Sequence, residues 1–152
     1  MTGWHLAQLN VARLLAPMDS PQLAEFVAAL DAVNAVADAA PGFVWRLQEE
    51  SGNATGLRPW GDDVIVNLSV WESAEALQAY VFRTSHADVL RRRREWFEPY
   101  GSAHLVLWWV PRGHVPELDE ARERLELVNQ VGPSPEAFTL RQPYDPPQAQ
   151  PA

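Results

Sequence analysis

The residues best suited to chemistry are polar side chains within apolar strands. Asn67, Ser69 and Trp71 alternate along the third predicted strand and therefore share one of its faces. A carboxamide in such a strand needs a hydrogen-bond partner or a ligand. Gln8 and Asn10 end the first predicted strand on a common face, and they complete a polar cluster if the two strands are neighbours. The alternative is that Asn67 bonds the backbone of a neighbouring strand and that Trp71 is part of the core.

Two histidines are candidates for proton transfer or ligand binding. His104 lies in the last predicted strand and can act as a general base near neutral pH. His86 precedes Asp88 in a His-x-Asp pattern, which is part of the residue set that holds non-haem iron. Residues two apart on a helix point in different directions, so we expect no metal site there. The simpler expectation is that His86 bonds a carbonyl at a helix break.

Aromatic side chains are the predicted walls of a cavity for a hydrophobic small molecule. The chain has seven tryptophans, which indicate large buried apolar surfaces. We expect Trp45, Trp109 and Tyr80 to line the cavity that contains Asn67. The Tyr80 hydroxyl then donates a hydrogen bond into the cavity, or else Tyr80 is a core residue whose hydroxyl reaches the rim.

Composition excludes much common chemistry. All 12 basic residues are arginine and there is no cysteine, which excludes Schiff-base lysines, disulfides, thiolate nucleophiles and cysteine-held metals. The glycines never form G-x-G, the core of the dinucleotide-binding fingerprint. The net charge of −8 opposes binding to nucleic acid, and no apolar run is long enough for a membrane span. We predict a cytoplasmic protein with no bound cofactor, no nucleic-acid partner and no membrane association.

The elements that must position these residues follow the hydrophobic pattern. One helix begins after the turn at residues 17–21 and ends before Pro41, and a second begins at its cap, Ser73. The predicted order is strand, helix, strand, strand, helix, strand, which is the ferredoxin-like split β-α-β sandwich of the α+β class. The four strands are predicted over residues 4–10, 43–48, 64–71 and 104–111.

One domain with a C-terminal extension is predicted. Residues 1–112 form a ferredoxin-like α/β-barrel domain, and residues 113–152 add a helix and a Pro-rich tail, packed on it or extending from it. The predicted strands are apolar on both faces, whereas helices cover only one face of a sheet in this topology. We therefore expect a homodimer in which two sheets pack face to face as a dimeric α/β barrel. The competing explanation is that the C-terminal segment folds back over the sheet.

A longer motif points to a family. The stretch NLSVWESAEAL at residues 67–77, followed after a helix by Ser85-His86, resembles the strand-to-helix signature of antibiotic-biosynthesis monooxygenase-like proteins of the dimeric α/β-barrel superfamily. Over about its first three quarters the chain is still more similar to a bacterial family, a domain of unknown function, placed beside them. The resemblance implies the fold more than the activity, because this superfamily hosts oxygenases, haem-degrading enzymes, isomerases and cyclases.

The resemblance also implies roles for individual residues. In the cofactor-free monooxygenases an asparagine and a tryptophan with this separation line the cavity, so Asn67 would polarise a substrate oxygen and Trp71 would form a wall. In haem-degrading relatives an asparagine on the first strand and a tryptophan on the third both occur, which Asn10 and Trp71 match. Those proteins also use a histidine where this chain has Val81.

The sequence therefore predicts a small-molecule enzyme resembling cofactor-independent monooxygenases, acting on a hydrophobic aromatic or polyketide-like substrate by oxygenation, isomerisation or cyclisation. Arg91 or Arg94 would hold an anionic substrate oxygen, as an arginine does in the monooxygenases. Two alternatives stay open: a non-catalytic dimeric ligand-binding or structural protein, and a haem-binding protein. The predicted catalytic residues are Asn67, Trp71 and His104, and the predicted substrate-binding residues are Asn10, Tyr80, His86, Arg91, Trp45 and Trp109.

Overall fold

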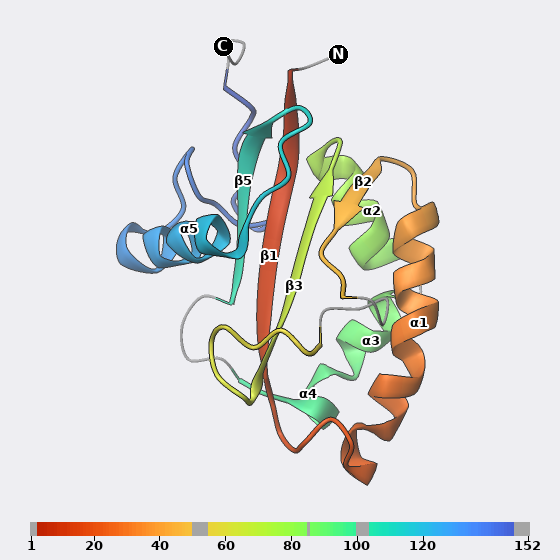
Figure 1. Cartoon of the computed structure of the whole chain (residues 1–152). Coiled ribbons are helices and arrows are strands. Elements are labelled where there is room, and N and C mark those ends of the chain that lie inside the picture. The colour runs from red at the N-terminus through yellow and green to blue at the C-terminus, as the bar shows by residue number, and fades with distance from the viewer. Residues whose placement is uncertain (1–2, 50–54, 85, 100–103, 148–152) are drawn as a thin grey trace.

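The centre of the molecule is one open antiparallel sheet in the order β2-β3-β1-β5 (Figure 1). The computed structural model describes residues 3–49, 55–84, 86–99 and 104–147. The short strand β4 pairs with the end of β1 on the same edge as β5. The strands are β1 (Trp4–Leu14), β2 (Phe43–Arg46), β3 (Val64–Trp71), β4 (Phe97–Glu98) and β5 (Leu105–Pro111).

Helices cover both sides of the sheet. Four of them lie on one side and α5 lies on the other (Figure 1). The strand order and the positions of the helices between the strands confirm the predicted α+β, ferredoxin-like fold with a C-terminal helix. In the described part of the chain, no helix has the length and hydropathy needed to cross a bilayer. The helices are α1 (Ala24–Ala39, after the 3-10 turn η1, Pro21–Leu23), α2 (Ala74–Arg83), α3 (His86–Arg91), α4 (Arg93–Trp96) and α5 (Leu118–Val131).

Two local features fix the start of α2. The Ser73 hydroxyl accepts a hydrogen bond from the backbone N–H of Ala76 at 3.1 Å, as expected for an N-cap. Gly42, between α1 and β2, has a φ of +81°, and a Cβ atom there would lie 2.5 Å from the Cβ of Ala76. Only glycine fits this close approach, and it brings the end of α1 against α2.

The second face of the sheet is covered by the chain itself. This face presents Val66, Leu68 and Trp108, which are buried against α5 and the loop at residues 55–63. The Trp108 indole N–H donates to a Glu120 carboxylate oxygen of α5 at 2.8 Å. Arg122 of α5 donates to the Pro59 carbonyl at 2.7 Å, which holds the loop against the helix.

The fold-back explanation for the apolar second face is therefore the one observed. The homodimer stays a prediction, but its original reason, a bare apolar face, is removed because α5 buries that face. The segment after α5 also covers an edge of the sheet. Phe138 and Leu107 exchange two backbone hydrogen bonds of 2.7 and 2.8 Å, which protects the outer edge of β5 from pairing with another chain.

Candidate functional site

The site lies on the sheet face that the four helices cover. Here the core consists of two separate clusters, one around Trp71 and Tyr80 and the other around Phe26 and Trp96. Along β3, Trp71 belongs to the first cluster and Ile65 packs against the second. Asn67 lies between them, directly opposite Asn10 of β1 in the strand register. A belt of polar side chains thus separates the two apolar clusters.

Gln8 is the centre of this polar belt. It is only 3% exposed, and its amide nitrogen donates to Asn67 Oδ1 at 2.5 Å and to Ser69 Oγ at 2.8 Å. The Trp71 indole N–H donates to the same Ser69 oxygen at 2.9 Å. The amide nitrogen of Asn10 lies 3.5 Å from Gln8 Oε1. The predicted cluster of Gln8, Asn10, Asn67 and Ser69 therefore forms across two neighbouring strands.

The exposure of Asn67 differs from what the sequence suggested. We expected a sheltered carboxamide, but the side chain is exposed to solvent. The physical reason is that the two apolar clusters cover the sheet above and below it. Gln8 occupies Oδ1, and the Asn67 NH₂ group donates to none of the residues that the structure describes. The result is a hydrogen-bond donor at an exposed position on the face of the sheet that the four helices cover.

Trp71 does not form an accessible wall of a cavity. It is 1% exposed, with Phe43 packed edge-on at 5.4 Å and Tyr80 stacked at 5.1 Å between ring centroids. The Tyr80 hydroxyl donates to the Val33 carbonyl at 3.3 Å. Burial raises the pKa of Tyr80 to about 12. Of the two interpretations of Tyr80, the structure shows the core residue. A ligand would have to displace Tyr80 to reach Trp71.

The two histidines lie apart from one another in the fold. The ring of His86 packs on Tyr80 at 5.0 Å, and its Nδ1 lies 3.3 Å from the Val81 carbonyl oxygen, which is the carbonyl bond expected at the helix break. Burial lowers the pKa of His86, which favours the neutral ring. His104 is exposed just before β5, and desolvation together with the Arg93 charge lowers its pKa.

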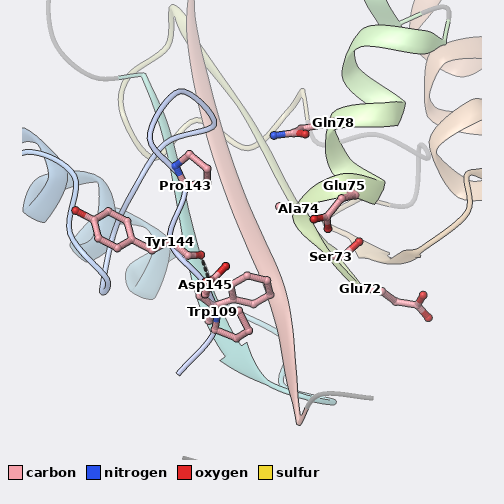
Figure 2. Close-up of a pocket in the computed structure, with 10 residues that line it drawn as sticks. Glu72, Ser73, Ala74, Glu75, Gln78, Trp109, Pro143, Tyr144 and Asp145 are labelled. Atoms are coloured by element: carbon pink, nitrogen blue, oxygen red, sulfur yellow. Dashed lines mark hydrogen bonds between the residues drawn. The ribbon is translucent and has the colours of Figure 1, made fainter. Parts of the chain in front are cut away.

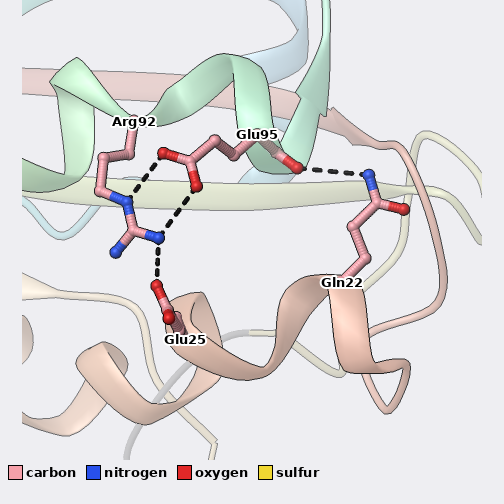
Figure 3. Close-up of polar contacts among 4 residues, drawn as sticks. All are labelled: Gln22, Glu25, Arg92 and Glu95. Carbon is pink, nitrogen blue, oxygen red and sulfur yellow. Dashed lines mark hydrogen bonds and ion pairs between the residues drawn. The ribbon is translucent and has the colours of Figure 1, made fainter.

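In the arginine run at residues 91–94, Arg91 and Arg92 form ion pairs at the protein surface. Arg91 has 69% of its side chain exposed and pairs with Asp88. Arg92 bridges Glu25 of α1 and Glu95 of α4, as Figure 3 shows, and lies over the Trp96 ring at 4.7 Å. The expectation that one arginine turns inward is therefore wrong for Arg91, because its guanidinium faces solvent.

Two tryptophans predicted to line the cavity lie elsewhere. A β-bulge between Phe43 and Trp45 turns Trp45 to the opposite face of the sheet, where it packs toward α5. Trp109 faces the helices but packs with the C-terminal segment, and its indole N–H donates to the Tyr144 carbonyl at 2.9 Å. It borders a separate cavity of about 300 Å³ between that segment and the start of α2 (Figure 2). Asn67 does not line this cavity.

Arg46 is a charged residue of the site that sequence reasoning missed. It pairs with Ser69 in the β2–β3 register, and its side chain is only 10% exposed. The guanidinium binds the Asp38 carboxylate through two bonds of 2.8 and 3.2 Å. An arginine inside a short apolar strand was the available signal, but the bulge at residue 44 hid which face it occupies. Among the residues that the structure describes, no three His, Asp or Glu side chains are grouped closely enough to hold a metal ion.

Comparisons with known proteins give one family and several distant structures. The profile of a domain of unknown function, DUF3291, matches residues 5–152, which confirms the family recognised from the sequence. A comparison with curated proteins gave no match.

Three of the similar solved structures come from different organisms. SnoaB, a cofactor-independent oxygenase from Streptomyces nogalater, is 19% identical with a TM-score of 0.47, and the match covers 74% of this chain and 98% of that one. A conserved protein from Methanosarcina mazei Go1 is 11% identical with a TM-score of 0.47, covering 72% and 93%. A dabb family protein with a ferredoxin-like fold from Mesorhizobium loti is 15% identical with a TM-score of 0.41, covering 74% and 98%.

Proposed function

We propose that this chain, which belongs to the family of the domain of unknown function DUF3291, binds a flat hydroxyaromatic or ketoaromatic molecule whose oxygen accepts a hydrogen bond from the Asn67 carboxamide. The observation that supports the proposal is the position of this amide. Its oxygen is held by the buried Gln8, and the residue is exposed between two apolar clusters. A donor fixed before the ligand arrives stabilises negative charge on a ligand oxygen without further reorganisation.

The surroundings of Asn67 fit a polarised oxygen on an apolar ring. Ile65, two residues away on the same face of β3, borders the apolar cluster around Phe26. On the other side, Arg46 lies next to Ser69, and its charge is paired with the Asp38 carboxylate. A ring can rest on the apolar part while its oxygen points to the Asn67 amide.

We further propose that the ligand is oxygenated without a cofactor. In such a reaction the substrate carbanion supplies the electrons that reduce dioxygen, and the protein contributes orientation and a donor for the developing oxyanion. In this proposal Asn67 acts as that donor.

A second candidate function, non-catalytic ligand binding, has its own supporting observation. The region around Trp71 is filled by Phe43 and Tyr80, so a ligand at Asn67 rests at an open surface position. An open position excludes water poorly, and water exclusion strengthens the electrostatic effects on which catalysis depends.

The binding step is tested with 1-naphthol and 2-naphthol as probes. A hydrogen bond to the ionised oxygen, at about 1.5 to 3 kcal/mol, should lower the pKa of the bound naphthol by about 1 to 2. Absorbance titration of the complex measures this directly. In Asn67→Leu the shift should disappear while the fold is retained, and Gln130→Leu on the exposed surface of α5 is the matched control. A naphthol pKa that is equally shifted in Asn67→Leu would refute the role of this amide.

Oxygen uptake separates the two functions. Consumption of dioxygen with a bound hydroxyaromatic, lost in Asn67→Leu, supports the oxygenase. Binding with the Asn67-dependent pKa shift but without oxygen uptake across a panel of hydroxynaphthalenes supports the non-catalytic binder.

A further inference from the structure

An apolar groove lies on the outer side of the helical layer, between the end of α1 and α2. It has a volume of about 700 Å³, and its apolar lining includes Val36, Ala39, Ala76 and Ala79. This surface is separate from the Asn67 site. Phe82, also on α2, is 57% exposed.

The charges along the groove follow the direction of α2. Glu72 and Glu75 lie at the N-terminal end of the helix, and Arg83 lies at its C-terminal end. All three are exposed, and none of them forms an ion pair with another of the described residues. The groove is therefore negative at one end and positive at the other, with unpaired charges at both ends.

This order of charges matches a second copy of the same helix that runs in the opposite direction. Ala79 lies midway between Glu75 and Arg83, which are eight residues or about 12 Å apart along the helix. If a second α2 lies antiparallel across the first at Ala79, Arg83 of each copy comes to the end where the other carries Glu72 and Glu75. A two-fold interface requires such self-complementarity, since the same patch serves both subunits. The small side chain of Ala79 allows the two helices to approach closely.

The outer surface of α1 extends the same apolar character. Its exposed positions Ala28, Ala32, Ala35 and Ala39 form a stripe of small side chains that leads into the groove, and the acidic Glu25, Asp31 and Asp38 are exposed at the edges of this stripe. A stripe of small side chains lets a second helix approach closely.

We propose that the occupant of this groove is a second copy of the chain, docked with its α2 antiparallel to the first across a two-fold axis near Ala79. This surface differs from the sheet face used for the original homodimer prediction, which α5 covers. The charge order selects a copy of the same chain because each end of the groove is complementary to the opposite end.

Cysteine trapping tests the location of the axis. The chain has no cysteine, so Ala79→Cys introduces the only thiol. Two such thiols face each other near the proposed axis, and mild oxidation should yield a covalent dimer of twice 17.0 kDa. Gln130→Cys, at an exposed position of α5, is the matched control and should stay largely monomeric.

Charge exchange tests the pairing. Sedimentation of the unmodified chain should show a dimer, and Arg83→Glu or Glu75→Arg alone should weaken it about tenfold or more, because like charges then meet at both ends. Mixing the two variants should restore the dimer, since each mixed pair has opposite charges at both positions. Charge changes that merely damaged the fold would not be rescued by mixing.

Three results would overturn the proposal. One is a single-chain mass for the unmodified protein throughout the micromolar to submillimolar range. Another is equal trapping of the two cysteine variants. The third is a dimer that forms but is insensitive to both charge variants, which would assign the contact to another surface.

Discussion

Replacement of Ser69 by alanine gives a sharp test of the polar belt. Ser69 is 6% exposed, and its hydroxyl oxygen accepts hydrogen bonds from Gln8 and from the Trp71 indole N–H. In Ser69→Ala, Gln8 keeps its bond to Asn67, but the indole N–H, on a side chain that is 1% exposed, loses its acceptor. A buried donor without a partner costs about 1 to 3 kcal/mol. We expect the free energy of unfolding to fall by about 2 kcal/mol.

Thermal and urea denaturation measure this loss. For a domain of this size about 1 kcal/mol corresponds to 2 to 4 °C in Tm, so the expected decrease is about 4 to 8 °C. The control is a double-mutant cycle with Trp71→Phe, which removes the indole donor. In the Phe background, Ser69→Ala should cost at least about 1 kcal/mol less. An equal cost in both backgrounds would show that the Ser69–Trp71 bond contributes nothing, and the account of the belt would be wrong.

Two further predictions concern pH and the covered sheet face. Burial lowers the pKa of His86 below its usual 6.5, so the unfolded chain binds the proton first. The free energy of unfolding therefore falls as the pH decreases through and below 6.5. His86→Phe should flatten this fall in urea titrations at a series of pH values, and an unchanged slope would contradict the prediction. Leu125 is 4% exposed in the core under α5, so Leu125→Ala should lower the free energy of unfolding by about 2 to 4 kcal/mol. Val131→Ala, at a site 65% exposed on the same helix, should cost less than about 0.5 kcal/mol; similar losses in both would mean that α5 does not pack as described.

Much of the fold was predictable because local rules determine it. The strand at residues 64–71 was predicted with the bounds that the structure gives, since its apolar, β-branched run lies between a turn-rich loop and the cap Ser73. The neighbourhood of Gln8, Asn10 and Asn67 also followed from topology, because β1 and β3 are adjacent in this fold.

The face of the sheet that a side chain occupies was predictable only where the strands are regular. In β3 the alternation holds without interruption, and the polar set was placed correctly. In β2 a single bulge reversed the expectation for Trp45 and concealed Arg46 next to Ser69. A bulge depends on the pairing with the neighbouring strand and leaves no clear mark in four residues of sequence.

The sequence by itself determined that both sheet faces are apolar and that a polar belt crosses one of them. Only the tertiary structure decided what covers each face: α5 on one side, and on the other two apolar clusters that seal Trp71 and leave Asn67 exposed. The physical reason is that the hydrophobic effect is non-directional. An apolar pattern specifies that a surface must be buried, while the choice between a distant segment of the same chain and a second molecule depends on contacts that no local pattern contains.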